Sequence, residues 1–159
     1  MDYGEPILEP ELRRTERQPT LAIRGTTTLA ELPRTIGEFL GEVHRRVVAL
    51  GERAVGQPYT RYHDARGERI ELEAGLPVAR DLSGEGRVRP SELPAAESAV
   101  LSHLGPYEAL VESGSRLGAW ALSQGRVACG PNWEIYVTDP GAVKDPAKWR
   151  TDIYMPLHD

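Results

Sequence analysis

Residues 130–139 read GPNWEIYVTD, and this stretch shows most directly what kind of fold the chain adopts. A Gly-Pro turn signal opens it, aromatic and β-branched residues follow, and an Asp-Pro-Gly turn begins at Asp139. This is the pattern of a short strand between two turns. Side chains alternate between the faces of a strand. One face therefore carries Trp133, Ile135 and Val137, and the other carries Glu134, Tyr136 and Thr138.

The two faces of this strand differ in character. Trp133 and Ile135 make one face apolar, and we predict that it packs into the core. The other face holds the carboxylate of Glu134 beside the phenol of Tyr136. A charge in mid-strand has to be paired, solvated or available to a ligand. We predict that Glu134 lies on the floor of a binding cleft, although a plain solvent-facing surface fits the alternation equally well.

Length and composition are those of an ordinary soluble protein. The chain has 159 residues, of which 40% are hydrophobic and 27% charged, which fits one domain or two small halves with a shared core. No apolar run is long enough to span a membrane, and the acidic N-terminus does not resemble a signal peptide. The single cysteine, Cys129, excludes an intrachain disulfide and fits a reducing compartment, so we expect a cytoplasmic protein.

Net charge and the absence of known motifs limit the classes of ligand and cofactor that we expect this chain to bind. A net charge of −5 argues against nucleic acid and favours a cationic small molecule. The histidines, His44, His63, His103 and His158, have no metal-ligand spacing, and Cys129 has no CxxC partner. The chain also lacks a phosphate-binding Gly-rich loop and a nucleophile-elbow motif. We therefore expect no metal, no cofactor and no membrane partner.

An amphipathic helix is the clearest element of the first half. Apolar residues recur at three- and four-residue steps from Leu29 to Leu50, which predicts a helix with one buried stripe. Pro33 is most comfortable in the first helical turn and places the start near Leu32. Gly51 then ends the helix.

Strands are predicted on both sides of that helix. Residues 11–15 and 20–25 read as strand, and the two together form one long bulged strand in our interpretation. Residues 59–78 predict an antiparallel hairpin in which Leu72 points inward and Glu73 points into water. The stretch 81–95 is rich in Gly, Pro and charge and reads as a linker.

The second half repeats this order. A strand at 99–104, a helix after the Gly-Pro pair at 105–106, and strands at 130–139 and 151–157 follow one another. The first repeat thus covers about 6–80 and the second about 96–159 of a single domain, 1–159. Two β-α-β-β units predict an α+β fold with one antiparallel sheet, both helices on one face, and a ligand cleft along the pseudo-two-fold seam of the opposite face.

Several motifs of the chain resemble the GyrI-like small-molecule-binding family. They are Gly105-Pro106-Tyr107, Leu117 and Trp120 on the helix, WEIYVTDP at 133–140 and TDIYMPL at 151–157. The resemblance is strongest in the second half, weaker over 20–78, and covers nearly the whole chain. The family includes the effector-binding domains of AraC- and MerR-type multidrug-responsive bacterial transcription regulators. We expect a stand-alone form without a helix-turn-helix and therefore no direct contact with DNA.

The resemblance implies a cleft in which aromatic side chains sandwich lipophilic, often cationic, ligands while a buried glutamate supplies the counter-charge. The glutamate of the family matches Glu134, and its tyrosines match Tyr107 and Tyr154. Trp120 lines the wall of this cleft or belongs to the core, and its helical spacing favours the core. The predicted ligand-binding residues are Glu134, Tyr136, Tyr154, Tyr107, Trp120 and Tyr62, the last being the repeat-mate of Tyr136.

Three functions follow from these patterns. The first is a binding protein for lipophilic cations. The second is an enzyme, because some GyrI-like proteins are hydrolases that open strained cyclopropane-containing toxins; Glu134 is the only residue here that we would assign as the base activating water. One positioned carboxylate is worth about 10²–10⁴ in rate, which suffices for a reactive substrate. The third is a protein-interaction module, since the family includes a gyrase inhibitor. The sequence favours binding and leaves catalysis open.

Overall fold

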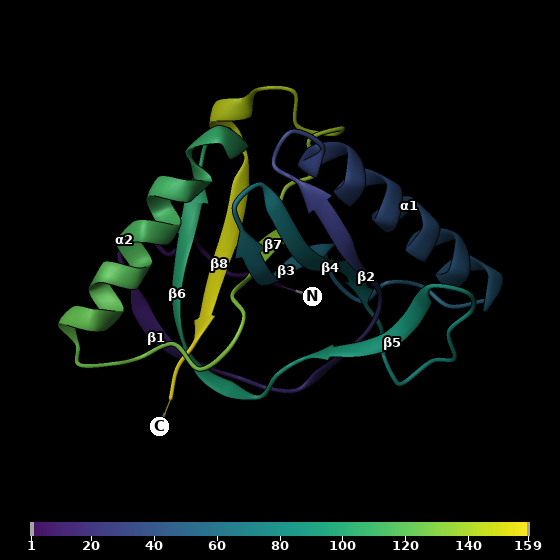
Figure 1. Ribbon diagram of the computed structural model, residues 1–159, viewed down its shortest axis with the longest axis horizontal. Helices are drawn as coiled ribbons and strands as arrows, with labels where there is room; N and C mark the ends of the chain where they lie inside the picture. The colour runs from purple at the N-terminus through teal and green to yellow at the C-terminus, as the bar shows by residue number, and fades with distance from the viewer. Residues whose placement is uncertain (1, 159) are drawn as a thin grey trace. The chain divides into compact units, whose positions relative to one another are not determined.

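The computed structural model describes residues 2–158, which form two compact units. The first unit holds Glu16–Ala95, and the second combines Asp2–Thr15 with residues 96–158. Within each unit one long helix lies on one face of an antiparallel sheet (Figure 1). The α+β class and the two β-α-β-β repeats predicted from the sequence are confirmed.

The first unit follows the predicted order of strand, helix and hairpin. Its elements are β2 (Gln18–Thr28), α1 (Leu32–Ala49), β3 (Tyr59–Arg66), β4 (Arg69–Pro77) and β5 (Val88–Leu93). The strands lie in the order β3-β4-β2-β5, and every neighbouring pair is antiparallel.

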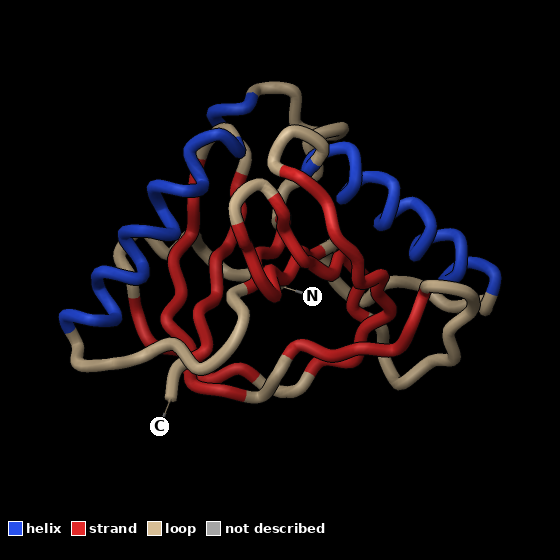
Figure 2. Tube along the Cα trace, in the orientation of Figure 1, coloured by secondary structure: helices blue, strands red, loops and turns tan. Residues whose placement is uncertain are grey.

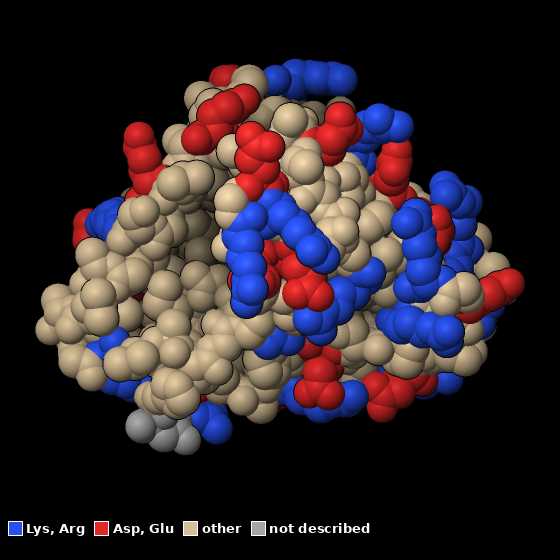
Figure 3. Space-filling model, in the orientation of Figure 1, with Lys and Arg blue, Asp and Glu red and all other residues tan. Residues whose placement is uncertain are grey.

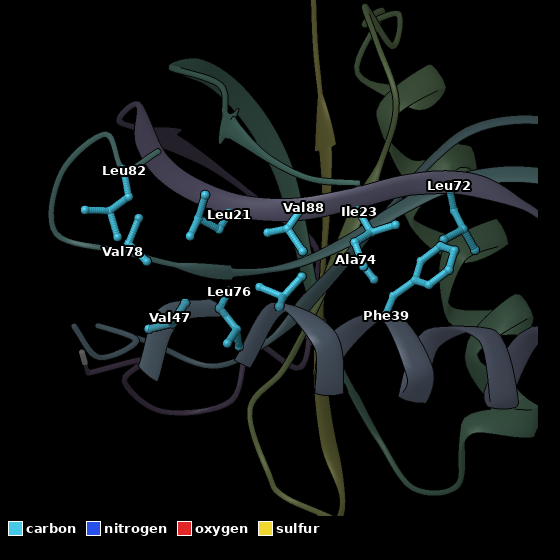
Figure 4. Packing of buried hydrophobic residues seen from close by; sticks show 11 residues of the cluster. Leu21, Ile23, Phe39, Val47, Leu72, Ala74, Leu76, Val78, Leu82 and Val88 are labelled. Atoms are coloured by element: carbon cyan, nitrogen blue, oxygen red, sulfur yellow. The ribbon is translucent and has the colours of Figure 1, made fainter. Parts of the chain in front are cut away.

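Helix α1 begins at Leu32, with Pro33 in its first turn as predicted. Phe39, Val43 and Val47 are buried on its inner face. They pack against the apolar side chains of β2, β4 and β5 shown in Figure 4. Leu29 was predicted to join this stripe, but it is 70% exposed because it precedes the first helical turn.

The second unit repeats the arrangement. Its elements are β1 (Glu11–Thr15), β6 (Ala96–Leu104), the short η1 (Tyr107–Ala109), α2 (Leu110–Ser123), β7 (Trp133–Tyr136), η2 (Pro146–Lys148) and β8 (Arg150–Pro156). The strands lie in the order β1-β6-β8-β7, again all antiparallel. Leu117 and Ala121 of α2 are buried against Leu101 and Ile153 of the sheet.

β1 and β5 each pair with a strand other than the one that follows them in sequence. β1 precedes β2 in sequence but pairs with β6, and β5 precedes β6 but pairs with β2. The prediction of one bulged strand over 11–25 is therefore wrong, because β1 ends at Thr15 and pairs in the second unit, whereas β2 begins at Gln18 and pairs in the first. The stretch 81–95, predicted as a linker, contains β5. Its Pro90 is compatible with a strand because β5 is the last strand in the order of its unit's sheet.

Glu73 is buried rather than solvated as predicted. Its exposed fraction is 4%. Its carboxylate accepts hydrogen bonds from Tyr59 Oη (2.7 Å), Ser91 Oγ (2.8 Å) and His63 Nε2 (2.7 Å). His63 reaches it from a β-bulge, and Ser91 belongs to β5. The alternation within β4 cannot reveal this network, because one of its members, Ser91, comes from β5, which lies outside the β3–β4 hairpin in sequence.

A buried ion pair fixes the N-terminal segment on the second unit. Arg150 donates to both carboxylate oxygens of Asp152 at 2.9 Å, and also to the backbone oxygens of Gly4 (2.7 Å) and Tyr3 (3.0 Å). Ser102 Oγ donates to Asp152 (2.7 Å) and accepts from the Ile7 amide (2.8 Å). The segment before β1 is thereby held on β6 and β8.

Replacement of Asp152 by Ala should lower the free energy of unfolding by about 3–5 kcal/mol, because it leaves the buried guanidinium of Arg150 without a counter-charge. The loss is measured by urea denaturation. As a control, Glu38→Ala breaks an exposed pair with Arg34 and should change stability by less than about 0.5 kcal/mol. Equal effects of the two changes would contradict this account of Arg150.

Gly75 allows β4 and β2 to approach closely. A Cβ atom at this position would lie 2.4 Å from the backbone oxygen of Leu21 and 2.7 Å from Ala22 Cβ. We expect Gly75→Ala to destabilise the protein by about 1–3 kcal/mol. The control is Gly37→Ala in α1, where nothing lies within 4 Å of the added Cβ. That change should stabilise the helix by about 0.5–1 kcal/mol in the same measurement, and destabilisation by both variants would rule out a steric cause specific to Gly75.

Candidate functional site

Strand β7 carries the central residues of the candidate site. It is shorter than predicted and ends at Tyr136. The amides of Val137 and Thr138 both donate to the backbone oxygen of Arg150, at 3.1 and 3.3 Å, so regular pairing with β8 stops there. A long loop follows, interrupted only by η2 (Figure 2).

The face of β7 that holds Glu134 and Tyr136 is the face on which α2 packs. Glu134 pairs with Ile153 of β8, and Tyr136 pairs with Thr151. Ile153 belongs to the cluster around Leu117 of α2. Directly opposed residues of antiparallel strands share a face. The predicted alternation is therefore present, but the expectation that Glu134 faces away from the helix is wrong for this unit.

Helix α2 does not sit directly over these residues. It contacts β6 most and β8 less. In the order β1-β6-β8-β7, β7 lies beyond β8. Glu134 and Tyr136 consequently stand beside the helix, next to the apolar cluster that contains Ile153.

Glu134 and Tyr136 form a hydrogen-bonded pair. The phenol of Tyr136 donates to Glu134 Oε1 at 2.6 Å, and Glu134 is 9% exposed. A hydrogen bond to an ionised acceptor is short and strong in this way. The phenol stabilises the carboxylate without adding a positive charge of its own.

Two more aromatic rings extend from this pair. The ring of Tyr107 lies 5.8 Å from that of Tyr136, and the indole of Trp149 lies 4.9 Å from Tyr107. The indole N–H of Trp149 donates to the Val143 backbone oxygen at 2.7 Å, which orients the ring. Trp149 was not predicted, and the signal that would have pointed to it is a tryptophan within an otherwise polar loop.

Tyr107 remains a neutral phenol near neutral pH. Burial raises the pKa of its phenol, and the negative charges of Glu134 and Asp139 raise it further. A neutral phenol can donate a hydrogen bond and presents an electron-rich ring face.

Tyr154 is separated from the group around Glu134. It pairs with Trp133, and the two rings stack in parallel at 5.3 Å on the face away from α2. Burial and then the charge of Asp152 raise the pKa of Tyr154. Trp133 is 2% exposed, so its predicted burial is confirmed.

The other two predicted residues lie in apolar surroundings. Trp120 is partly buried and packs against the cluster of α2, which agrees with the core alternative. Tyr62 belongs to the first unit, where it packs beside Leu72 on the α1 side of the sheet. The second unit therefore brings together Glu134, Tyr136 and Tyr107 from the predicted set and adds Trp149.

Surface charge does not mark the site. Ions of both signs interleave over the β3–β4 hairpin in Figure 3, where Arg66 contacts Asp64 at 2.9 Å and Arg24 contacts Glu71 at 3.2 Å. Among residues 2–158, no group of His, Cys, Asp and Glu side chains is suited to hold a metal ion. No helix in that range is both long and apolar enough to cross a bilayer. What the site offers chemically is one buried carboxylate, phenol donors and aromatic ring faces.

Comparison with known structures finds the same fold elsewhere. The chain superposes on the EcmrR chain of an EcmrR–DNA complex with a TM-score of 0.84 at 20% identity, over 95% of this chain and 57% of that one. It therefore spans little more than half of the EcmrR chain. The isolated EcmrR C-terminal domain gives a TM-score of 0.77 at 20% identity, covering 95% of this chain and 98% of the domain.

Two further neighbours are more distant. A hydrolase encoded by lin2189 from Listeria innocua matches with a TM-score of 0.66 at 13% identity, over 98% of this chain and 95% of that one. SAV2435, solved bound to tetraphenylphosphonium, gives a TM-score of 0.65 at 13% identity, over 95% of this chain and 94% of SAV2435. At these identities the likeness shows the fold alone.

A search of curated protein sequences finds no match. The model of the GyrI-like small molecule binding domain, in contrast, matches residues 8–158. This match covers nearly the whole chain, which therefore belongs to the GyrI-like family of small-molecule-binding domains.

Proposed function

We propose that this chain binds lipophilic cations of the multidrug type, as a cytoplasmic sensor or sequestering protein, with Glu134 as the counter-charge. The observation that carries the proposal is the buried carboxylate of Glu134, hydrogen-bonded by Tyr136 and set beside the rings of Tyr107 and Trp149. The tetraphenylphosphonium carried by SAV2435, a protein of the same fold, agrees in ligand class.

The energetics favour a delocalised cation over a compact one. An aromatic ring attracts a cation by about 0.5–2 kcal/mol, and more when water is excluded. A compact ammonium loses a large hydration energy on entering an apolar site, whereas a cation whose charge is spread over aromatic groups loses less. The neighbouring apolar cluster around Ile153 and Leu117 suits the hydrocarbon part of such a ligand.

Glu134→Gln should weaken the binding of tetraphenylphosphonium at least about tenfold, or 1.4 kcal/mol, because the amide keeps the shape of the side chain but not its charge. Affinity for a neutral ligand of similar size, triphenylmethanol, should hardly change. Both are measured by quenching of tryptophan fluorescence, with calorimetry as a check.

The matched control is Glu112→Gln, which removes the same charge from an exposed position of α2 in the same unit. It should leave both affinities unchanged. Equal weakening of the cation by the two variants would mean that net charge, not the Glu134 site, attracts the ligand. Equal weakening of the cation and the neutral ligand by Glu134→Gln would point to a loss of shape.

Hydrolysis is the second candidate, because the site places a carboxylate and a phenol side by side. Glu134 can accept a proton from water, while the neutral Tyr107 phenol beside it can donate one. Attack of the water oxygen on a strained cyclopropane carbon would open a ring C–C bond, and the ring carbon that leaves would take up a proton. The net change is addition of one water molecule to the substrate.

Incubation with a reactive cyclopropane compound separates the two candidates. On the binding proposal, mass spectrometry should detect no water adduct beyond the amount formed without protein. Catalytic formation of the adduct by the wild-type chain, lost in Glu134→Gln, would instead establish the hydrolase.

A further inference from the structure

A histidine next to the site has both ring nitrogens engaged. His103 lies in β6 and is 6% exposed. Its Nδ1 is 2.7 Å from Ser113 Oγ on α2, and its Nε2 is 2.8 Å from the backbone oxygen of Pro106. One imidazole thus connects the sheet, the helix and the turn that leads into η1.

The chemistry of the partners fixes the hydrogen on Nε2 of this ring. A backbone oxygen can only accept, so Nε2 carries a hydrogen that it donates to Pro106. The Ser113 hydroxyl can donate to a bare Nδ1 or accept from a protonated one. Both ring nitrogens therefore have a compatible partner.

The turn held by His103 determines where Tyr107 stands. Gly105 has a φ of +126°, a conformation that other residues rarely adopt, and its amide donates to the Trp149 backbone oxygen at 2.8 Å. Tyr107 follows Pro106 directly and places its ring against Trp149 and Tyr136. The turn is consequently tied to His103 on one side and to Trp149 on the other.

We propose that His103 is a positioning residue for ligand binding, which holds the Gly105–Pro106 turn so that Tyr107 meets the ligand beside Glu134. The inference rests on the proposed function, because it assigns Tyr107 to the ligand site. His103 itself acts through Tyr107 and does not touch the ligand.

A double-mutant cycle on tetraphenylphosphonium binding tests the proposal. His103→Ala should weaken binding roughly fivefold in the wild-type background and have almost no effect when Tyr107 is already Ala. His103→Gln, whose amide can still donate to Pro106, should recover most of the affinity. Additive effects of His103→Ala and Tyr107→Ala would overturn the proposal, because a general loss of structure acts regardless of Tyr107.

A second measurement needs no ligand and works even if the protein fails to bind cations. Burial and Glu134 raise the pKa of Tyr107, so a Tyr107 released from its place should ionise at lower pH. Spectrophotometric titration of His103→Ala, with and without Tyr107→Phe, isolates this phenol. An unchanged Tyr107 titration in His103→Ala would refute the positioning role. Absence of cation binding by the wild-type chain, with the titration shifted as expected, would refute only the binding function.

If His103→Ala does not fold, Ser113→Ala takes its place in both measurements. It removes the Nδ1 partner and keeps the hydrogen bond to Pro106. A smaller shift in the same direction supports the proposal, and no shift in either measurement contradicts it.

Discussion

The antiparallel pairing of β8 with β7 is the constraint on which the site depends. Side chains of β8 alternate between the two faces of the sheet. Thr151 and Ile153 lie on the face covered by α2. Arg150 and Asp152 lie on the opposite face, where they bind the N-terminal segment. Because the period of a strand is two, a slip of one residue would exchange every one of these side chains between faces. The buried Arg150–Asp152 pair opposes such a slip, since it would place both charges among the apolar side chains under α2. The register that presents Glu134 is thus protected from the other side of the sheet.

The second unit is assembled from two stretches of sequence that lie on either side of the first unit along the chain. The first unit takes all its strands from the continuous stretch Glu16–Ala95, whereas the second unit needs β1 from before that stretch. Loop-closure entropy grows only slowly with loop length, so such distant pairing costs little more than a local one at equilibrium. It does mean that truncating the N-terminal segment removes a strand from the unit that carries Glu134 and not from the unit that follows it in sequence. The duplicated fold is in this sense less modular than the repeat suggests.

Features that depend on local sequence were predictable, and those set by distant partners were not. The periodicity around Phe39 and Val43 predicted α1, because the pattern of an amphipathic helix is contained in residues that are close in sequence. Alternation correctly divided Glu134 from Trp133, but it cannot tell which face a helix covers, and here that choice was wrong. β5 was not predicted, because Pro90 and the charged residues near it have the composition of a linker. Its pairing with β2 cannot be inferred from this composition. The family resemblance supplied Glu134 and Tyr107, whereas Trp149 entered the site through a loop whose course no local pattern predicts.

The three carboxylates buried among residues 2–158 differ in their surroundings, and the proposed binding role falls to the one beside several aromatic rings. Asp152 forms an ion pair with the guanidinium of Arg150. That guanidinium also donates hydrogen bonds to the backbone of the N-terminal segment. Glu73 accepts hydrogen bonds from Tyr59, Ser91 and His63, so its oxygens are engaged within the unit. Glu134 is hydrogen-bonded by Tyr136, and the rings of Tyr107 and Trp149 continue the surface beside it. Ring faces accept hydrocarbon and positive charge together, and they do so without demanding one fixed shape. A site built from ring faces and one carboxylate should therefore select its ligands by charge and apolar area, and tolerate wide variation in their outline.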